Sequence, residues 1–422
     1  MPSKIQPVKG TREFYPEQMA LRNFVYEKVR AASQAFGYQE WDGPFIEPID
    51  LYAAKSGEEL VKKQSFVFTD RGGDEIALRP ELTPSLARMI AAKQGELTFP
   101  VRWWSFGPFW RYEQPQKGRS REFFQWNIDL LGADSPEADA ELIAVAATFL
   151  RSVGLDPARA TIFVNNRRLM VSQFDALGVP SEKQLDVSNL VDRRAKMEPA
   201  KWDTYALELG LSQVQLDGLK SLLGNFELWK ESDELVRLFA ALDALGVKEY
   251  VKFDPNIVRG LLYYTSTVFE AFETSGSLKR AILGGGRYDN LLADVGGQPL
   301  PATGFAMGDV VIGIVLQENG LVPEFNPSPA SVLVTMFDES LRLQSLSLAA
   351  ELRQAGLNTM VYPEPIKLPK QFKFADKMKM KVAVTIGPDE AANGLVAVKN
   401  LLNGEQVIVT REAAAETIRK IL

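Results

Sequence analysis

One short stretch of the chain concentrates positive charge between apolar residues. Residues 106–132 read FGPFWRYEQPQKGRSREFFQWNIDLLG, with Arg111, Lys117, Arg119 and Arg121 around a loop that joins two strand-like runs. Arginine grips phosphate through two parallel hydrogen bonds. We therefore predict that two antiparallel strands hold a nucleoside triphosphate, with Arg111 at the α-phosphate and Arg119 and Arg121 on the loop side.

A surface hairpin is the alternative interpretation of the same residues. Its arginines would pair with Glu113 and Glu122, and exposed ion pairs of this kind contribute little to stability. The cations are numerous and the flanking runs are apolar. We therefore favour the phosphate site over the hairpin.

The absent residue types limit the chemistry. The chain contains no histidine and no cysteine, which excludes disulfides, thiolate nucleophiles and cysteine-bound zinc. It also lacks the commonest general base. Catalysis must then use arginine, lysine, carboxylates, amides, tyrosine or a metal that arrives with a ligand. This set suits phosphoryl or nucleotidyl transfer, in which positioning and charge stabilisation supply most of the rate.

Length and charge bound the architecture and the partners. The 422 residues predict two or three domains. The net charge of -6 gives no global basic field, so nucleic acid would have to bind local basic patches. No apolar run is long enough to span a membrane, and the first residues resemble neither a signal nor a transit peptide. We predict a cytoplasmic protein with no membrane partner.

Periodicity and punctuation predict the elements around the cationic stretch. Helices are expected at 16–36 and 81–93, and another begins at Pro136 with Ser135 as its cap. Strands are expected at 65–70, 76–79, 101–112, 121–132, 261–272 and 279–283. Residues 167–248 change character and predict an inserted helical module. After a proline-containing linker, the tail alternates strands and helices, which predicts a compact α/β domain with mixed pairing.

The chain resembles a known family at several separate segments. The run WRYEQPQKGRSREFFQ resembles motif 2 of the class II aminoacyl-tRNA synthetases, in the form found in histidyl-tRNA synthetases. Further segments resemble that family in order along the chain: ALRPELTPSLAR (77–88), IVRGLLYYTSTVFEAF (257–272), AILGGGRYDNLL (281–292), GFAMGDVV (304–311), and the tail at 370–390 and 396–406. The chain would then be a histidine- and cysteine-free variant of the family.

The resemblance implies a fold and domain limits. It implies an α+β fold, with the class II antiparallel sheet flanked by helices, a helical insertion and a C-terminal α/β anticodon-binding domain. The catalytic domain would span 1–322 with the insertion at about 167–248, followed by a linker at 323–330 and the anticodon-binding domain at 331–422. The segment around Pro44 resembles motif 1, which implies a C2 homodimer.

The resemblance also implies the partners and the site residues. Histidine, ATP with its own Mg²⁺, and tRNA(His) would bind, and no protein side chain is assigned as a metal ligand. Arg111 and Arg259 would be catalytic. The ATP-binding residues would be Arg111, Glu113, Arg121 and Arg259. The histidine-binding residues would be Glu81, Thr83, Gln125, Asp129, Arg259, Tyr263, Tyr264 and Tyr288. The tRNA-binding residues would be Gln116, Lys117, Lys370 and Lys373, with Lys377 and Lys379 in the same basic patch.

Two positions depart from the family pattern, and one rival function remains. Most members follow the motif 3 glycine with an apolar residue, a glutamate and an arginine that meets the γ-phosphate, whereas Gly308 is followed here by Asp-Val-Val. Arg121, Lys117 or Mg²⁺ would then carry that charge. Leu262 replaces a more usual aspartate. The missing arginine favours a catalytically silent paralog that regulates ATP phosphoribosyltransferase, but such paralogs typically lack the C-terminal tail.

Overall fold

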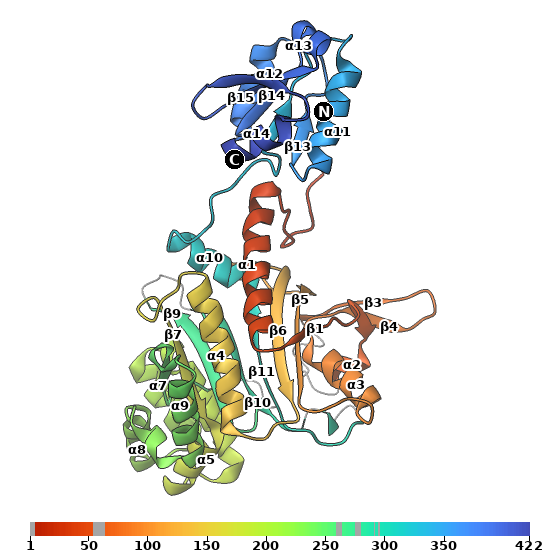
Figure 1. The fold of residues 1–422 in the computed structure, drawn as a ribbon. Coiled ribbons are helices and arrows are strands. Elements are labelled where there is room, and N and C mark those ends of the chain that lie inside the picture. The colour runs from red at the N-terminus through yellow and green to blue at the C-terminus, as the bar shows by residue number, and fades with distance from the viewer. Residues whose placement is uncertain (1–4, 54–63, 259–263, 275–279, 291, 294–295) are drawn as a thin grey trace. The chain divides into compact units, whose positions relative to one another are not determined.

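Figure 1 shows the computed structural model, which describes residues 5–53, 64–258, 264–274, 280–290, 292–293 and 296–422. The chain divides into two compact units, Met1–Pro323 and Glu324–Leu422. The predicted Arg259, Leu262 and Tyr263 lie outside the described residues. The narrower prediction of a linker at 323–330 stays a prediction.

A large sheet organises the first unit. Its described strands run in the order β1 (Gln39–Glu40), β5 (Val101–Trp110), β6 (Glu122–Leu131), β11 (Ala302–Gly308), β10 (Leu283–Tyr288), β9 (Thr267–Glu273), β7 (Ala160–Asn166), β8 (Val251–Phe253). Pairing is antiparallel through the middle. The two outermost pairs, β1 with β5 and β7 with β8, are parallel. The predicted antiparallel sheet is therefore correct for the centre, and the edges make it mixed.

Two long helices cover one face of this sheet. α1 (Pro16–Ala35) and α4 (Pro136–Ser152) lie along the central strands in Figure 1. The predicted cap of α4 is confirmed, because the Ser135 hydroxyl accepts the Ala138 N–H at 3.2 Å. Phe149 of α4 is buried and packs on Trp126 of β6, with ring centroids 5.4 Å apart. Each large apolar side chain buried in this layer contributes roughly 1.5–3 kcal/mol.

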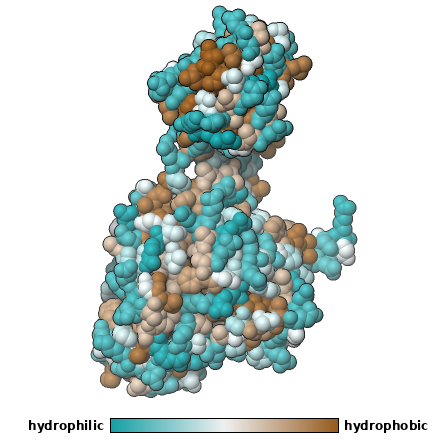
Figure 2. Space-filling view, viewed as in Figure 1, coloured by the Kyte–Doolittle hydropathy of each residue, from teal (hydrophilic) through white to brown (hydrophobic). Residues whose placement is uncertain are grey.

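A smaller layer precedes the central strands. β2 (Ile46–Pro48), β4 (Glu75–Leu78) and β3 (Phe66–Thr69) form an antiparallel sheet in that order. Along the chain, α2 (Asp50–Ala53) follows β2 and α3 (Thr83–Lys93) follows β4. Figure 2 shows apolar atoms gathered over β3 and β4 beside a polar turn. Phe45, Ile46, Val67 and Phe68 are exposed there.

The structure describes helices across 167–248, and their assignment as an inserted module stays a prediction. These are α5 (Arg167–Ala176), α6 (Gln184–Arg193), α7 (Pro199–Glu208), α8 (Gln213–Leu223) and α9 (Asp233–Ala244). Short 3-10 turns connect several of them, among them η3 (Arg194–Lys196). Figure 1 shows the group beside β7 and β9. Of the helices that the structure describes, none is long and apolar enough to cross a membrane.

The second unit has the mixed α/β pairing predicted for the tail. Its sheet runs β13 (Thr359–Val361), β12 (Val332–Val334), β14 (Val382–Thr385), β15 (Leu395–Asn400), β16 (Gln406–Thr410). The first two pairs are parallel and the last two antiparallel. The helices are α11 (Arg342–Gln354), α12 (Leu368–Lys377), α13 (Pro388–Asn393) and α14 (Ala414–Ile421). Gly356 ends the first of these with φ of 81°, which glycine adopts without steric cost.

Candidate active site

A cleft of about 890 Å³ opens where β6 begins and β11 ends. Its volume is in the range of small-molecule sites. The loop after β5, the start of α10 (Asp309–Glu318) and the η3 turn of the helical module all contribute to its wall. Its charged lining residues are Arg111, Glu113, Arg119, Asp192, Lys196, Glu270, Glu273 and Arg280. Gln125 and Phe123 line it from β6.

Arg111 is held in place at this cleft. Its Nε donates to the Pro80 carbonyl at 2.8 Å, and its guanidinium carbon lies 5.3 Å from the centre of the Phe123 ring. Its backbone N–H donates to Arg121 O at 2.9 Å, which continues the β5–β6 ladder past Trp110. The side chain is thus positioned before any ligand arrives, and its remaining nitrogens are donors suited to a phosphate.

The three other cationic side chains of the loop each have contacts within the protein. Arg119 pairs with Glu113 at 3.0 Å, so the ion pair expected of a simple hairpin is present here alongside the cleft. Arg121 points elsewhere: its Nε donates to Glu113 O, its Nη1 donates to Lys9 O, and its guanidinium lies 4.1 Å from the Tyr112 ring. Lys117 pairs with Glu318 at 2.9 Å. Neither Arg121 nor Lys117 lines the cleft.

A second group of predicted residues is buried in the sheet. Asp129 of β6 is 6 % exposed, and the Tyr288 hydroxyl donates to its Oδ1 at 2.5 Å. Burial raises the pKa of Asp129 to about 7, although the Tyr288 hydrogen bond acts in the opposite direction. Tyr264 and Tyr288 share an apolar cluster with Leu86 and Ala87 of α3. The helix that carries Thr83 therefore packs against this group.

Glycines make the room for these side chains. Asp129 stands opposite Gly304 in the β6–β11 ladder, and Gly304 stands opposite Gly286 in the next ladder. A Cβ on Gly304 would lie 2.0 Å from Asp129 Oδ1, and one on Gly286 would lie 2.9 Å from Tyr264 Cδ1. The GGG run thus lies inside strand β10, where it leaves room for neighbouring side chains.

Gly304→Ala is expected to destabilise the fold by about 2–4 kcal/mol, because the new methyl group collides with a buried carboxylate and with Ile128 O. Gly308→Ala is the matched control. Its Cβ would meet nothing within 4 Å, and Gly308 has φ of -81°. Urea unfolding of the two variants checks the difference. Equal stability would show that the sheet relaxes around Gly304 without cost.

The remaining predicted residues lie at three other places. Thr83 is the first residue of α3, and Glu81 precedes it; neither lines the cleft. Gln116 pairs with Arg119 at the loop tip. Lys370 and Lys373 are exposed on α12 of the second unit, as is Lys377. Lys379 pairs with Glu324 at 2.5 Å. The structure thus brings Arg111, Glu113 and Gln125 together in one cleft.

The whole chain was compared with known proteins. The family model for histidyl-tRNA synthetase matches residues 10–309, and an anticodon binding domain matches residues 314–421. The chain belongs to the histidyl-tRNA synthetase family. It is 38% identical over 430 residues to histidine–tRNA ligase of Opitutus terrae, which covers 98% of both chains. It is 36% identical to the chloroplastic/mitochondrial histidine–tRNA ligase of Arabidopsis thaliana, which covers 95% of this chain and 84% of the relative.

A solved structure agrees with these relatives. The crystal structure of histidyl-tRNA synthetase from Nostoc sp. PCC 7120 superposes with a TM-score of 0.85 at 26% identity and covers 100% of each chain. The predicted family and the predicted α+β class II fold are therefore confirmed.

Asp309 stands where most members of this synthetase family were expected to have an apolar residue. Its carboxylate accepts from Arg12 Nη2 at 2.8 Å and from the Phe124 N–H at 2.8 Å. It ties the N-terminal segment and β6 to the start of α10. Val310 and Val311 follow it and line the cleft. Asp309 therefore has structural partners, and the next two positions bring no charge to the site.

Arg287 of the GGGRYD segment was not predicted as a site residue, and the structure explains its presence. It is 2 % exposed and pairs with the buried Asp139 of α4 at 2.8 Å. It also donates to Ser135 O and Ala133 O. Removing one partner of such a pair leaves an uncompensated buried charge. The arginine thus fixes α4 on the sheet beside Tyr288.

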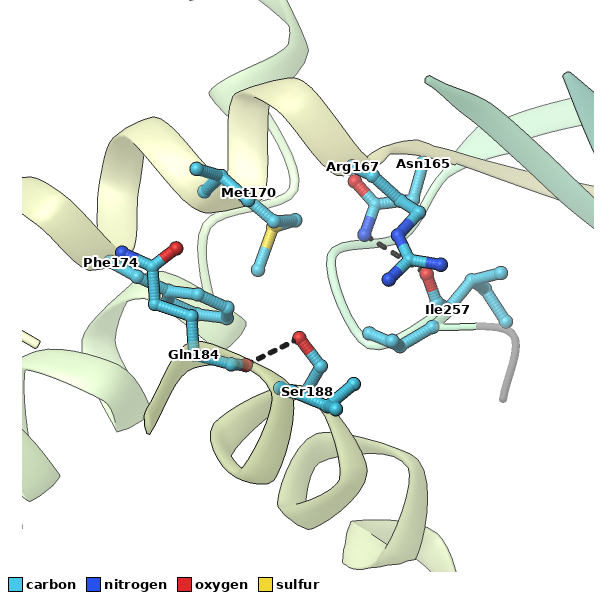
Figure 3. A pocket seen from close by; sticks show the side chains of 10 residues that line it. Asn165, Arg167, Met170, Phe174, Gln184, Ser188 and Ile257 are labelled. Atoms are coloured by element: carbon cyan, nitrogen blue, oxygen red, sulfur yellow. Dashed lines mark hydrogen bonds between the residues drawn. The ribbon is translucent and has the colours of Figure 1, made fainter. Parts of the chain in front are cut away.

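A smaller cavity of about 120 Å³ lies in the helical module between α5 and α6. Figure 3 shows Met170 and Phe174 on one side of it and Ser188 on the other. The Asn165 amide donates to Ile257 O at 3.0 Å. Ile257 and Val258 line both this cavity and the large cleft. The module thus supports the segment that leads toward the predicted Arg259.

Proposed function

We propose that this chain activates histidine with ATP and transfers the histidyl group to the 3′ end of tRNA(His). One observation carries the proposal. Arg111 is fixed in an ATP-sized cleft beside Glu113 and Gln125. Family membership over the whole chain supports the same reaction. The carboxylate–phenol pair of Asp129 and Tyr288 supplies a partner for the substrate's imidazole.

The activation step needs no nucleophile from the protein. A carboxylate oxygen of histidine attacks the α-phosphorus of ATP and forms the new P–O bond. The bond from that phosphorus to the β-bridging oxygen breaks, and pyrophosphate leaves. Arg111 would neutralise the charge that accumulates on the α-phosphate oxygens, with the predicted Arg259 as the second cation. Donors fixed in advance act at this moment without reorganisation. A chain without histidine or cysteine can therefore perform the step.

Histidine would bind in the buried group below the cleft. We propose that Asp129 and Tyr264 hydrogen-bond the two imidazole nitrogens, with Tyr288 holding the Asp129 carboxylate, and that Tyr263 lies nearby. Glu81, Thr83 and Gln125 would hold the ammonium and carboxylate groups. A site built to pair both ring nitrogens rejects isosteres that cannot pair, by about four orders of magnitude in favourable cases.

ATP would enter as its magnesium complex. Among the described residues, no group of three or more carboxylates is close enough to hold a metal ion. Glu113 would contact the adenine and Arg111 the α-phosphate, while Mg²⁺ would neutralise charge on the phosphates that it accompanies. Arg121 was predicted at the outer phosphates, and its contacts with Glu113 O and Lys9 O direct it away from the cleft wall.

Histidine-dependent exchange of pyrophosphate into ATP tests the proposal. We expect exchange with histidine alone among the amino acids, and we expect it to collapse in Arg259→Ala. Charging of tRNA(His) would follow. Histidine binding without exchange at high ATP would instead favour a regulatory subunit of ATP phosphoribosyltransferase. The anticodon binding domain that matches residues 314–421 supports the ligase over that rival, because the rival's members typically lack the tail.

The second unit would bind tRNA through a basic face. Lys370, Lys373 and Lys377 are exposed on one side of α12, while Gln371 and Ala375 are buried on the other. Lysine ammonium groups in such a row bind phosphates. Gln116 and Lys117 would contact the acceptor end at the first unit.

Replacing Lys370 and Lys373 together by alanine is expected to raise KM for tRNA(His) several-fold. It should lower the slope of log affinity against log salt by about one for each phosphate that the protein no longer neutralises. Pyrophosphate exchange should be unchanged, because exchange needs no tRNA. Lys420→Ala is the matched control, since Lys420 is exposed on α14 and pairs with Glu416. An unchanged salt slope would remove α12 from the tRNA interface.

A homodimer is also proposed. The segment around Pro44 precedes β2. The exposed apolar side chains of Ile46 and Phe68 lie on the small sheet, and exposed Phe45 directly precedes it. An exposed apolar patch marks an interaction site in many proteins. Sedimentation velocity should give a mass near twice that of the chain, and a concentration-independent monomer would contradict the dimer. The cytoplasmic localisation stays a prediction.

A further inference from the structure

Arg280 is one of the charged residues of the cleft that were not predicted from the sequence. It immediately precedes the segment AILGGGRYD, and its side chain lines the cleft. A Cβ on Gly118 would lie 3.0 Å from Arg280 Cδ and 3.7 Å from Val311 Cγ2. The side chains of Arg280 and Val311 therefore border the same glycine of the loop.

The cleft's other charges are already engaged. Arg119 pairs with Glu113, Lys196 pairs with Asp192, and Glu273 accepts from Asn319. Arg111 donates to Pro80 O, and Glu270 has its own interaction. Among the residues that the structure describes, the Arg280 guanidinium has neither an ion-pair partner nor a hydrogen-bond acceptor. Burial and the nearby Arg119 lower the pKa of Arg280, while Glu113 opposes the shift.

A guanidinium kept without a partner beside a second guanidinium calls for an anion with several negative oxygens. ATP is such an anion, and Arg111 marks the proposed place of its α-phosphate in the same cleft. Arg121 and Lys117, which were expected to meet the outer phosphates, are bound elsewhere. Val311, the third residue after Gly308, has no charge to offer.

We propose that Arg280 binds the terminal phosphates of ATP and takes the place of the arginine that is absent at position 311. The inference rests on the proposed function for its substrate. Its new content is that the cation comes from the segment before β10, whereas the family pattern places it on the helix after β11. The two positions converge because both side chains border Gly118.

Direct binding of nucleotides tests Arg280 independently of turnover. Calorimetry would use a non-hydrolysable ATP analogue with an α,β-methylene bridge, and AMP as the probe that lacks the terminal phosphates. Arg280→Ala is expected to weaken the ATP analogue by about ten- to a hundredfold, the range for a charge-assisted hydrogen bond, and to leave AMP unchanged. Thermal unfolding should match that of the parent, since the Arg280 guanidinium holds no other described part of the fold in place.

A second-site variant makes the assignment specific. Val311→Arg in the Arg280→Ala background should restore most of the affinity for the ATP analogue, because the new guanidinium would start beside the same glycine. Equal weakening of AMP and the analogue would overturn the proposal, as would unchanged binding of both. If Arg280→Ala raises only KM for tRNA, the proposal is also wrong, and Arg280 would instead contact the acceptor end of the tRNA. If the parent chain shows no pyrophosphate exchange, the proposed function is wrong. The role of Arg280 would still stand if the parent binds the ATP analogue more tightly than AMP and Arg280→Ala loses that difference.

Discussion

Replacing Arg111 by alanine is expected to lower kcat for histidine-dependent pyrophosphate exchange by about a thousandfold. The loss of one fixed donor at a charge that develops in the transition state typically costs about a hundred- to a thousandfold. Arg111 should fall at the upper end because it carries a full charge and can donate two parallel hydrogen bonds to a phosphate. Its Nε donates to Pro80 O, which fixes the guanidinium at the cleft before ATP binds.

The Arg111 experiment separates transition-state stabilisation from ground-state binding. A fall in kcat at little-changed KM for ATP would place Arg111 at the α-phosphate, whereas a rise in KM alone would make it a uniform binding residue. Arg111→Lys should recover only part of the rate, because an ammonium cannot bind bidentately. Arg237→Ala is the matched control: Arg237 forms an exposed two-bond pair with Glu137 and should leave exchange unchanged. Full activity of Arg111→Ala would refute the proposed mechanism.

Local patterns in the sequence were sufficient for most elements. Ser135 and Pro136 specified the start of α4, because capping depends on a few adjacent residues. The strands on both sides of the cationic loop were also predicted correctly. The parallel pairing of β1 with β5 and of β7 with β8 was not predicted, since pairing between distant segments depends on the whole sheet.

The positions of the site's side chains were harder to predict than the helices and strands. Arg111 directly follows β5 and lines the cleft, where its role at the α-phosphate stays a prediction. Arg121 was expected at the phosphates, but its long side chain turns onto Tyr112 and the Lys9 carbonyl. Residue type alone cannot choose between two such orientations. Arg280 and Arg287 were not predicted for a related reason. The position of Arg280 is set by its contact with the loop at Gly118, and that of Arg287 by its ion pair with Asp139 of α4.

Asp129→Asn is expected to weaken histidine binding by about a hundredfold at pH 8. The carboxylate supplies a charged acceptor for an imidazole N–H, and a bond to a charged group of this kind contributes about 1.5–3 kcal/mol. The asparagine has nearly the same shape and can still accept from Tyr288, so the loss should report charge and not a cavity. Equilibrium binding of histidine at pH 8, where its own ring is neutral, checks the value. Undiminished affinity would exclude Asp129 as the partner of the ring.

The same substitution is expected to stabilise the ligand-free protein at pH 8, and the sign follows from the raised pKa. Burial holds the pKa of Asp129 at about 7 in the folded state, against about 3.9 in an unfolded chain. Between these values the folded state keeps a proton that the unfolded state releases, so the free energy of unfolding falls as pH rises and then levels off above pH 7. The penalty reaches about 4 kcal/mol at most.

Asparagine has no such slope, so urea unfolding at pH 5 and pH 8 should show a gap between parent and variant that widens at the higher pH. Equal pH slopes in the two proteins would mean that Asp129 is ionised in the folded state well below pH 7. The binding pocket would then hold its negative charge before histidine arrives, and the cost of ionising it would not be part of substrate binding.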